Sequence, residues 1–495
     1  MPQPAPFRQI SFYGSKDTGR PTAPADVPIA QRKALYEKFQ AGVIEWNDGN
    51  ALTRNMNEWF VPLFVDTDPR QLDRLKAIYS AINKALIHLV DNWWTDEEAD
   101  FPKRMPIEKH QEQLLRWIGS REESHMPSYA ERRDVQRPDF LIEQIEGPSE
   151  PVERLKICEI NGRWPYNGFH LAFMVEYAAA KLFPERLGMT WDLDEKTTQR
   201  KLVGLFDASK PLHIIKDGEN NADIYIFARK YHEITGQPVT IIAPVDVVLA
   251  PDASSETGKA LFYRKVVSKE ESEWVDVQLE RIYQCSIEPH QPEQSYYDLE
   301  THQHLARICV NDMRTAFLTN DKRLLGVLWE EVDSLAQKHV LTTEEAATLR
   351  DALIPTYNPG SASLQEIVRQ SRTNPLAKDR YIIKAIRGAG GRDIYYGAAL
   401  SQEEWLAYVE PLAAADPVVA QQNYIVQDAL HQMEYDIVRT RVCEEVERFC
   451  LVGTFHTISG RYAGMGPWRV AYQKEFIPLI SGDNIMMVSA VPEAE

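Results

Sequence analysis

The spacing of hydrophobic residues changes along the chain and divides it into regions. From residue 28 to residue 120 apolar positions recur at helical spacing, most clearly in RQLDRLKAIYSAINKALIHLV. Between residues 137 and 161 two strand-like runs, DFLIEQI and RLKICEI, flank the turn-rich EGPSEPVE and predict a β-hairpin. GFHLAFMVEYAAAKLF then indicates a largely buried helix. The pattern therefore predicts a helical N-terminal extension over residues 1–110 and a hairpin lobe over residues 111–205.

The second half of the chain mixes strands and helices. LHIIKD, NNADIYIFARKYHEITG and PVTIIAP predict one βαβ unit, which implies some parallel sheet. Helical spacing returns between residues 298 and 353, and from residue 379 strands alternate with glycine-rich turns. We therefore predict an α/β (α+β) fold with an α/β region over residues 206–310 and a final lobe over residues 311–495.

Composition narrows the class of protein. The chain has 495 residues, 44% hydrophobic and 26% charged, which is typical of a soluble protein of two or three domains. Its formal net charge of -18 argues against general nucleic-acid binding, which needs a basic surface. No apolar run reaches the roughly 18 residues of a membrane span, and MPQPAPFRQISF lacks the apolar core of a signal peptide, so we expect a cytoplasmic protein. The five cysteines lack CxxC spacing, which argues against a disulfide or zinc scaffold.

The predicted hairpin carries a group of polar side chains. If its strands pair antiparallel about Ser149, Asp139 lies opposite Glu159 and Arg137 lies opposite Asn161. All four side chains then share one face, because strand side chains alternate with period two. Carboxylate and amide oxygens suit Mg²⁺, and an arginine beside them suits a phosphoryl group. The alternative is the solvent-facing side of an ordinary hairpin, and a slip in register would separate these residues.

A second segment, DRYIIKAIRGAGGRDIYYG, suits phosphate binding. Its first strand delivers Lys384, and Gly388, Gly390 and Gly391 lie in the following loop. Glycines let backbone N–H groups approach phosphate oxygens closely. The segment lacks both the Walker pattern and GxGxxG, so we interpret it as a strand-turn-strand flap over phosphates. The alternative is a plain glycine-containing hairpin with a surface lysine.

Together these two segments resemble the ATP-grasp superfamily, whose carboxylate ligases combine a lysine-bearing strand and a glycine-rich flap with an acidic cluster ending in Glu-x-Asn. Here the Glu-x-Asn strand comes before the nucleotide lobe, an order that resembles the circularly permuted branch and the synthetase domain of glutathionylspermidine synthase. The resemblance implies a circularly permuted ATP-grasp-like fold, with the substrate side over residues 206–310 and ATP bound by residues 311–495. It implies that Arg137 contacts phosphate. The implied Mg²⁺ ligands are Asp139, Glu159 and Asn161.

Further matches extend the resemblance through the C-terminal half. Lys322 in FLTNDKRLLGVL and Lys384 match two nucleotide-binding lysines, and Arg469 in TISGRYAGMGPWRV matches a phosphate contact. The YIVQDAL segment lies where the family holds adenine and the ribose. The residues implied there are Gln427, Asp428 and Leu430.

The chain departs from this pattern after Glu-x-Asn. It has GRWPYNGF where the glutathionylspermidine enzymes have ADTPT, so their substrates are not carried over. Arg163 and Tyr166 either contact a substrate of this protein or pack against the hairpin. In YDIVRTRV, Asp436 and Arg439 fall on opposite strand faces, so one faces solvent, and Arg439 is the candidate contact.

These features and the resemblance predict an ATP- and Mg²⁺-dependent ligase. A small-molecule carboxylate would attack the γ-phosphate of ATP, and an amine would capture the acyl phosphate with release of ADP and phosphate. Two alternatives stay open: a nucleotide-binding regulatory protein without turnover, and a phosphotransferase to a hydroxyl. We expect small-molecule acid and amine partners and neither a nucleic acid nor a membrane, and we leave a homodimer open.

Overall fold

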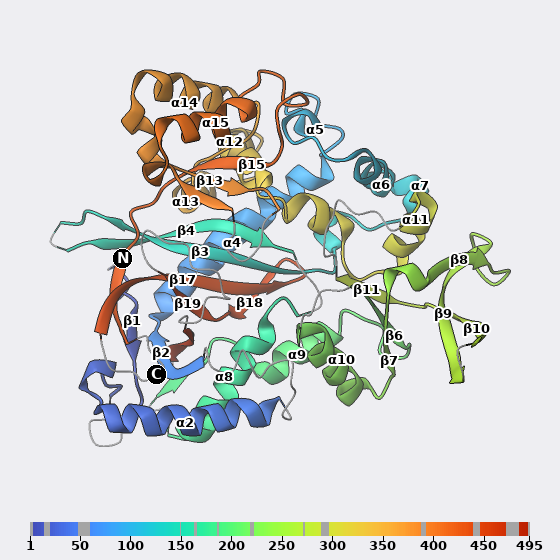
Figure 1. Ribbon diagram of the computed structural model, residues 1–495, viewed down its shortest axis with the longest axis horizontal. Coiled ribbons are helices and arrows are strands. Elements are labelled where there is room, and N and C mark those ends of the chain that lie inside the picture. The colour runs from blue at the N-terminus through green and yellow to red at the C-terminus, as the bar shows by residue number, and fades with distance from the viewer. Residues whose placement is uncertain are drawn as a thin grey trace.

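The computed structural model has a large central sheet with helices packed around it, and smaller sheets beside it (Figure 1). None of the described helices combines the length and apolarity that crossing a membrane requires. The structure describes residues 3–13, 20–47, 60–148, 150–162, 166–185, 188–217, 222–270, 273–288, 297–387, 393–438, 446–471 and 485–493.

Ten strands of the described residues form the large sheet, with the main order β1-β2-β20-β19-β17-β3-β4. β16 and β18 also pair with β17, and β5 pairs with β20. Neighbouring strands are antiparallel except β2 and β20, which are parallel. The strands are β1 (Arg8–Ile10), β2 (Phe60–Asp66), β3 (Val135–Ile145), β4 (Val152–Asn161), β5 (Met189–Thr190), β16 (Glu434–Val438), β17 (Val446–Ile458), β18 (Arg461–Met465), β19 (Trp468–Ala471) and β20 (Met486–Pro492).

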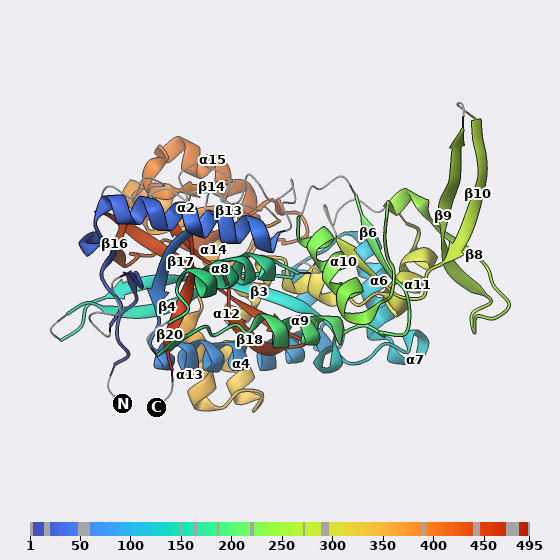
Figure 2. The ribbon, with the colours of Figure 1, turned by 90° about the horizontal axis from the view of Figure 1, so that it is seen from below.

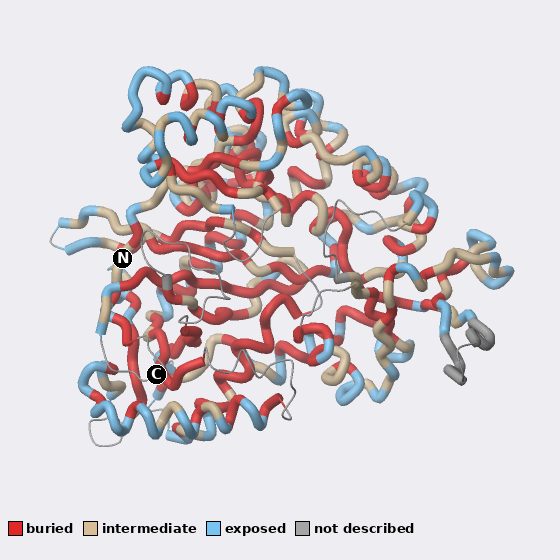
Figure 3. Tube along the Cα trace, viewed as in Figure 1, coloured by how far each residue is buried: buried red, intermediate tan, exposed pale blue. Residues whose placement is uncertain are grey.

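Helices bury both faces of this sheet, and the buried residues follow it across the molecule (Figure 3). β2 illustrates this, because Leu63 and Val65 belong to the core beneath α4 and α12, whereas Phe64 belongs to the core beneath α2 and α8. α4 begins at Pro69, where the side chain of Asp68 accepts from a backbone N–H and caps the helix. The helices of this body are α2 (Ile29–Trp46), α4 (Pro69–Asp91), α5 (Phe101–Arg104), α6 (Lys109–Gly119), α7 (Arg121–Ser124), α8 (Phe169–Leu182), α9 (Glu195–Val203), α12 (Arg323–Gln337) and α13 (Thr343–Ala352).

A four-stranded sheet lies over the β3-β4 hairpin, between it and the helices α14 (Ala362–Thr373) and α15 (Gln402–Leu412) (Figure 1). Ile383 packs with these helices on the outer face of that sheet. Because side chains alternate along a strand, its neighbour Lys384 points to the inner face, toward the hairpin. The strands, in the order β12-β15-β13-β14, are β12 (Thr356–Tyr357), β13 (Tyr381–Ala385), β14 (Ile394–Tyr396) and β15 (Tyr424–Asp428).

Two further three-stranded sheets lie at one end of the molecule (Figure 2). In the first, β6 is parallel to both β7 and β11, with α10 connecting β6 to β7, so the predicted βαβ unit is confirmed. The second sheet is antiparallel and projects away from the body. These elements are β6 (Leu212–Lys216), α10 (Ala222–Thr235), β7 (Val239–Ile242), β8 (Val247–Pro251), β9 (Lys259–Glu270), β10 (Glu273–Arg281), β11 (Cys285–Glu288) and α11 (Leu299–Ile308).

The N-terminal region differs from the helical extension predicted over residues 1–110. It contains the expected helices α2 and α4, but β1 and β2 are strands of the large sheet. The run FVPLFVD is buried on both of its faces, and a short apolar run of this kind is typical of a central strand. The N-terminal residues therefore help to build the body that carries β3 and β4.

Candidate active site

The β3-β4 hairpin has the predicted register at the end that carries the polar residues. Arg137 pairs with Asn161, and Asp139 pairs with Glu159. A bulge follows, because Phe140 pairs with Ile157 and the intervening Cys158 has no opposite residue. Bulges of this kind often redirect side chains next to active sites. The four polar side chains are therefore brought to one end of the hairpin, as the sequence predicted.

Asp139 lies between two arginines. Its Oδ1 accepts from Nε of Arg137 at 3.1 Å, and its Oδ2 accepts from Nη2 of Arg469 at 2.5 Å. Arg469 comes from β19, which pairs with β17, and β17 pairs with β3. Burial lowers the pKa of Arg469, but the negative charges of Asp139 and Glu159 more than offset this and raise the pKa overall. The two arginines predicted to contact phosphate are thus held by one buried carboxylate.

Glu159 lies beside Lys322 and Asn161. Nζ of Lys322 is 3.4 Å from Oε2 of Glu159, and Nδ2 of Asn161 donates to Oε1 at 3.2 Å. Burial raises the pKa of Glu159, but the charges of Lys322 and Lys384 lower it more strongly, and the pKa lies below its ordinary value. Glu159 is therefore ionised at neutral pH and available to a cation.

Lys384 reaches the same place from the four-stranded sheet. Its side chain is buried, and Nζ donates to the backbone oxygen of Cys158 at 3.2 Å. Because Cys158 directly precedes Glu159, this bond places a second ammonium group at the acidic end of the hairpin. The lysine-bearing strand and the acidic hairpin, predicted separately, meet in the structure.

Lys322 is positioned by a segment whose other polar residues the sequence analysis did not single out. The π-helical turn η5 (Thr315–Thr319) leads to Asn320, whose Oδ1 accepts from the backbone N–H of Gly162, just after β4. Asp321 is buried and accepts three hydrogen bonds from Arg323, one from its backbone N–H and two from its guanidinium. The run TND before the lysine was the available signal, because small polar residues beside a helix start often make such bonds.

The predicted adenine hinge lies on β15 and just after it. Gln427 is buried, and its Nε2 donates to Oγ1 of Thr356 at 2.8 Å. Asp428 accepts from the hydroxyl of Tyr357 at 3.0 Å, and burial raises its pKa. Leu430 packs against the cluster that includes Cys158, behind the acidic end of the hairpin.

Two residues that the sequence left open between contact and packing or solvent, Tyr166 and Asp436, have clear surroundings in the structure. Tyr166 is buried and packs against Phe227 at a ring-centroid distance of 5.1 Å, which favours the packing interpretation. Asp436 is exposed, so it is the residue of its pair that faces solvent. The remaining predicted residues lie outside the described residues. They are Arg163, Gly388, Gly390, Gly391 and Arg439.

A buried histidine that the sequence analysis did not single out lies behind the arginines. His456, on β17, is fully buried and stacks on Phe169 with ring centroids 3.9 Å apart. Burial, followed by the charges of Arg137 and His170, holds the pKa of His456 well below its ordinary value. His456 is therefore neutral and packs next to Arg137 without adding charge to the site.

The charges at the site suit a bound anion that carries a metal ion. Four cationic side chains surround the two carboxylates, which leaves positive charge for phosphate oxygens. The cations are Arg137, Lys322, Lys384 and Arg469.

No three His, Cys, Asp or Glu side chains of the described residues form a ready metal cage. Mg²⁺ does not need one, because it keeps several waters and binds through one or two carboxylates together with substrate phosphates. The donors present at the site fit that mode of binding.

Comparison with known proteins identifies the class of protein as the ATP-grasp enzymes. Residues 78–318 match the AnkG N-terminal domain. The chain is 33% identical over 473 residues to the ATP-grasp enzyme ankG of Aspergillus thermomutatus, covering 93% of this chain and 95% of that protein. The chain therefore belongs to the AnkG family of ATP-grasp enzymes. A solved glutathione synthetase-like effector from Globodera pallida, in its apo form, is 11% identical with a TM-score of 0.46 over 87% of this chain and 89% of its own, a likeness too distant to add to the argument.

Proposed function

We propose that this protein is an ATP- and Mg²⁺-dependent ligase that joins a small-molecule carboxylate to an amine and releases ADP and phosphate. The observation that carries the proposal is the meeting of Lys322 and Lys384 with Glu159, beside the two arginines that hold Asp139. ATP-grasp family membership supports the use of ATP. The order of the segments, with Glu-x-Asn before the lysine-bearing strand, supports a circularly permuted arrangement.

Each group has a role in this proposal. Lys322 and Lys384 neutralise the phosphates of ATP, and Arg137 and Arg469 stabilise the phosphoryl group during its transfer. The glycine-rich segment over residues 388–391 lies outside the described residues, and its covering of the phosphates is an expectation from the sequence. Glu159 and Asn161 would hold Mg²⁺. Asp139 would be a third ligand, because each of its carboxylate oxygens keeps a lone pair that is not used in the hydrogen bonds from Arg137 and Arg469. Bound Mg²⁺ would neutralise the charge that develops on the phosphate oxygens. Adenine and ribose would lie against Gln427, Asp428 and Leu430.

The chemistry needs positioning and charge neutralisation more than a protein nucleophile. An oxygen of the acid's carboxylate forms a bond to the γ-phosphorus, and the bond to the β-phosphate oxygen breaks to release ADP. The amine nitrogen then attacks the acyl carbon, and the carbon to oxygen bond breaks to release phosphate. The amine proton passes to solvent or to the departing phosphate.

Nucleotide binding is tested first by thermal unfolding with a non-hydrolysable ATP analogue and Mg²⁺, separately and together. A ligand that binds the folded state raises the midpoint by mass action. We expect a shift for the wild type that needs both ligands and is largely lost in Glu159→Gln. Asp436→Asn, which removes an exposed carboxylate, is the matched control and keeps the shift. If the wild type shows no shift, the proposal is wrong.

The reaction is tested with acid and amine pairs that release ADP. An acid labelled with ¹⁸O in its carboxylate transfers label to inorganic phosphate only when an acyl phosphate forms. Phosphoryl transfer to a hydroxyl instead leaves phosphate on the acceptor and releases none. A regulatory protein without turnover binds the nucleotide analogue and forms no ADP with any pair.

A further inference from the structure

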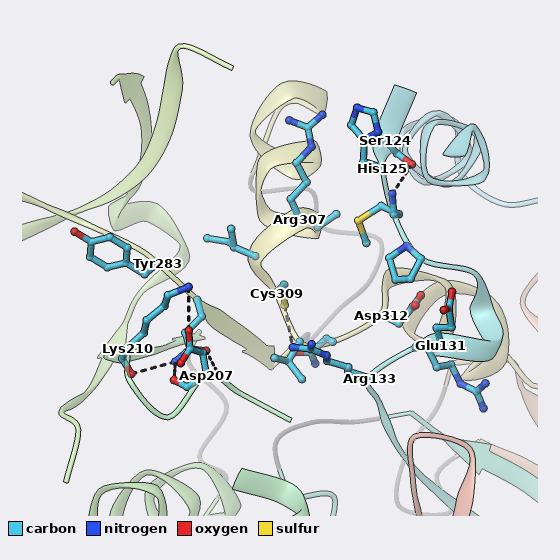
Figure 4. Close-up of a pocket in the computed structure, with 18 of the residues that line it drawn as sticks. Ser124, His125, Glu131, Arg133, Asp207, Lys210, Tyr283, Arg307, Cys309 and Asp312 are labelled. Carbon is cyan, nitrogen blue, oxygen red and sulfur yellow. Dashed lines mark hydrogen bonds and ion pairs between the residues drawn. The ribbon is translucent and has the colours of Figure 1, made fainter. Parts of the chain in front are cut away.

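A cleft separate from the hairpin end lies at the junction of α7, α11 and the loops that precede β6 and β11. Its volume is about 820 Å³, a size that suits a small organic molecule. Figure 4 shows Arg133 in the cleft, with Asp207 and Lys210 on one side and Glu131 and Asp312 on the other. Apolar and polar side chains both line the cleft, and its charged groups distinguish between anionic and cationic ligands.

Most carboxylates of the cleft already have partners. Oδ2 of Asp207 is 3.1 Å from Nζ of Lys210, and Oδ2 of Asp312 accepts from Nη2 of Arg314 at 2.7 Å. Oε2 of Glu131 accepts a hydrogen bond from the hydroxyl of Ser128 at 2.9 Å. Glu256 is exposed on the rim and is the carboxylate of the cleft without a partner among the described residues. The inner carboxylates therefore offer little to a cationic ligand.

Two arginines of the cleft, unlike its paired carboxylates, have no partner of opposite charge among the described residues. Nη1 of Arg133 donates to the backbone oxygen of Leu205 at 3.2 Å, and the guanidinium of Arg307 lies 5.2 Å from the ring centroid of Trp117. Neither guanidinium forms an ion pair with a carboxylate of the described residues. Both residues are exposed, so their remaining N–H groups are accessible. Arginine binds carboxylates through paired, charge-assisted hydrogen bonds.

We propose that this cleft binds a carboxylate-bearing small molecule, anchored by Arg133 and Arg307. We further assign that molecule as the part of the acid substrate that does not react, and this second step rests on the proposed ligase function. Arg133 precedes Arg137 by four residues on the segment that enters β3, which spans about 13 Å in an extended chain. The cleft therefore holds a distal carboxylate while another carboxylate of the same molecule reaches the hairpin end.

The binding step is tested without ATP or Mg²⁺, so that its outcome does not depend on catalysis. The full-length protein is titrated with succinate, glutarate and adipate by calorimetry, with succinamide as the uncharged control. We expect at least one dicarboxylate to bind and succinamide not to bind. Arg133→Gln and Arg307→Gln should each weaken binding about tenfold or more, and Arg307→Lys should recover part of the loss.

Two control variants separate this cleft from other anion sites. Arg369→Gln removes an exposed arginine that pairs with Glu366, far from the cleft on α14, and should leave binding unchanged. Lys338→Met removes an exposed lysine that pairs with Asp96 and should also leave binding unchanged. The proposal is overturned if no dicarboxylate binds, if the cleft arginines do not matter, or if the two control variants weaken binding as much as the cleft variants do.

The reactivity of Cys309 provides a second, independent test of where the ligand binds. It lines the cleft and is partly exposed, whereas Cys158, Cys285 and Cys450 are buried. Mass spectrometry after brief treatment with a maleimide should show slower modification of Cys309 when the dicarboxylate is present. Unchanged labelling of Cys309 at saturating ligand would place the binding site elsewhere and overturn the proposal.

Discussion

Arg469 and Asp139 are 330 residues apart in sequence, and Nη2 of the arginine lies 2.5 Å from Oδ2 of the carboxylate. Asp139 also accepts from Arg137, and its side chain is almost completely buried. One carboxylate therefore fixes two guanidinium groups and joins the last part of the chain to the β3-β4 hairpin. This arrangement makes Asp139 important both to the site and to the stability of the large sheet.

Replacing this carboxylate by an amide should destabilise the fold. In Asp139→Asn both arginines lose their acidic partner in a buried setting, which costs about 2–3 kcal/mol of unfolding free energy. Asp436→Asn removes an exposed carboxylate near Arg448 and should change stability by less than about 0.5 kcal/mol. Urea unfolding measures both. Equal small effects would mean that the Asp139 contacts do not contribute to stability.

Removing the charge of Lys384, the buried lysine on β13, should not destabilise the fold. Lys384→Met removes a buried ammonium group whose desolvation is costly, so the protein without nucleotide should be as stable as the wild type or more stable. The same change should weaken binding of ATP with Mg²⁺ about tenfold or more, because one phosphate loses its cation. Lys338→Met, at an exposed ion pair with Asp96, is the control. Calorimetric titration checks the result, and unchanged affinity in Lys384→Met would contradict the role of this lysine.

The hairpin illustrates what the sequence could predict. Strand side chains alternate with period two, and the turn-rich segment between the runs centres near Ser149, so the opposition of Asp139 to Glu159 followed from the residues alone. The βαβ unit followed in the same way from two apolar runs around a helical one. Both features could be predicted because they depend on the spacing of apolar residues within one short segment.

Other features could not be predicted, because they depend on contacts between distant segments. The bulge at Cys158 leaves no mark in an apolar run, and the hydrogen bond that the backbone N–H of Gly162 donates to Asn320 exists only after α12 docks on the hairpin. β2 was assigned to a helical region because helices surround it in sequence. The burial of His456 next to Arg137 likewise depends on the packing of α8 against β17.

His456 should make stability depend on pH. Its pKa is held well below the ordinary value by burial and by neighbouring positive charge, so the unfolded chain takes up a proton below about pH 6.5 and the folded protein does not. The unfolding free energy should therefore fall by about 1.4 kcal/mol for each pH unit below 6.5 from this residue alone. His456→Phe keeps a ring against Phe169 and should flatten the profile between pH 6.5 and pH 5 by that amount. Identical slopes in the two proteins, measured by urea unfolding, would contradict this account.

Gly168 should link backbone conformation to the arginine site. It caps the N-terminus of α8 with φ of +91°, and a Cβ at this position would lie 3.4 Å from Nη1 of Arg137. Gly188 has φ of +69° with no atom of the described residues within 4 Å of its Cβ position, so it is a matched control for strain alone. Gly168→Ala and Gly188→Ala should each cost about 1–2 kcal/mol of unfolding free energy, because both must adopt a left-handed conformation.

Only Gly168→Ala also places a methyl group in van der Waals contact with Arg137, so strain at this position reaches the arginine and should reduce the midpoint shift that the ATP analogue and Mg²⁺ produce. Both variants are compared with and without these ligands by thermal unfolding. If the two variants keep the same ligand-induced shift, the loop before α8 does not position Arg137, and the arginine is held by Asp139 alone.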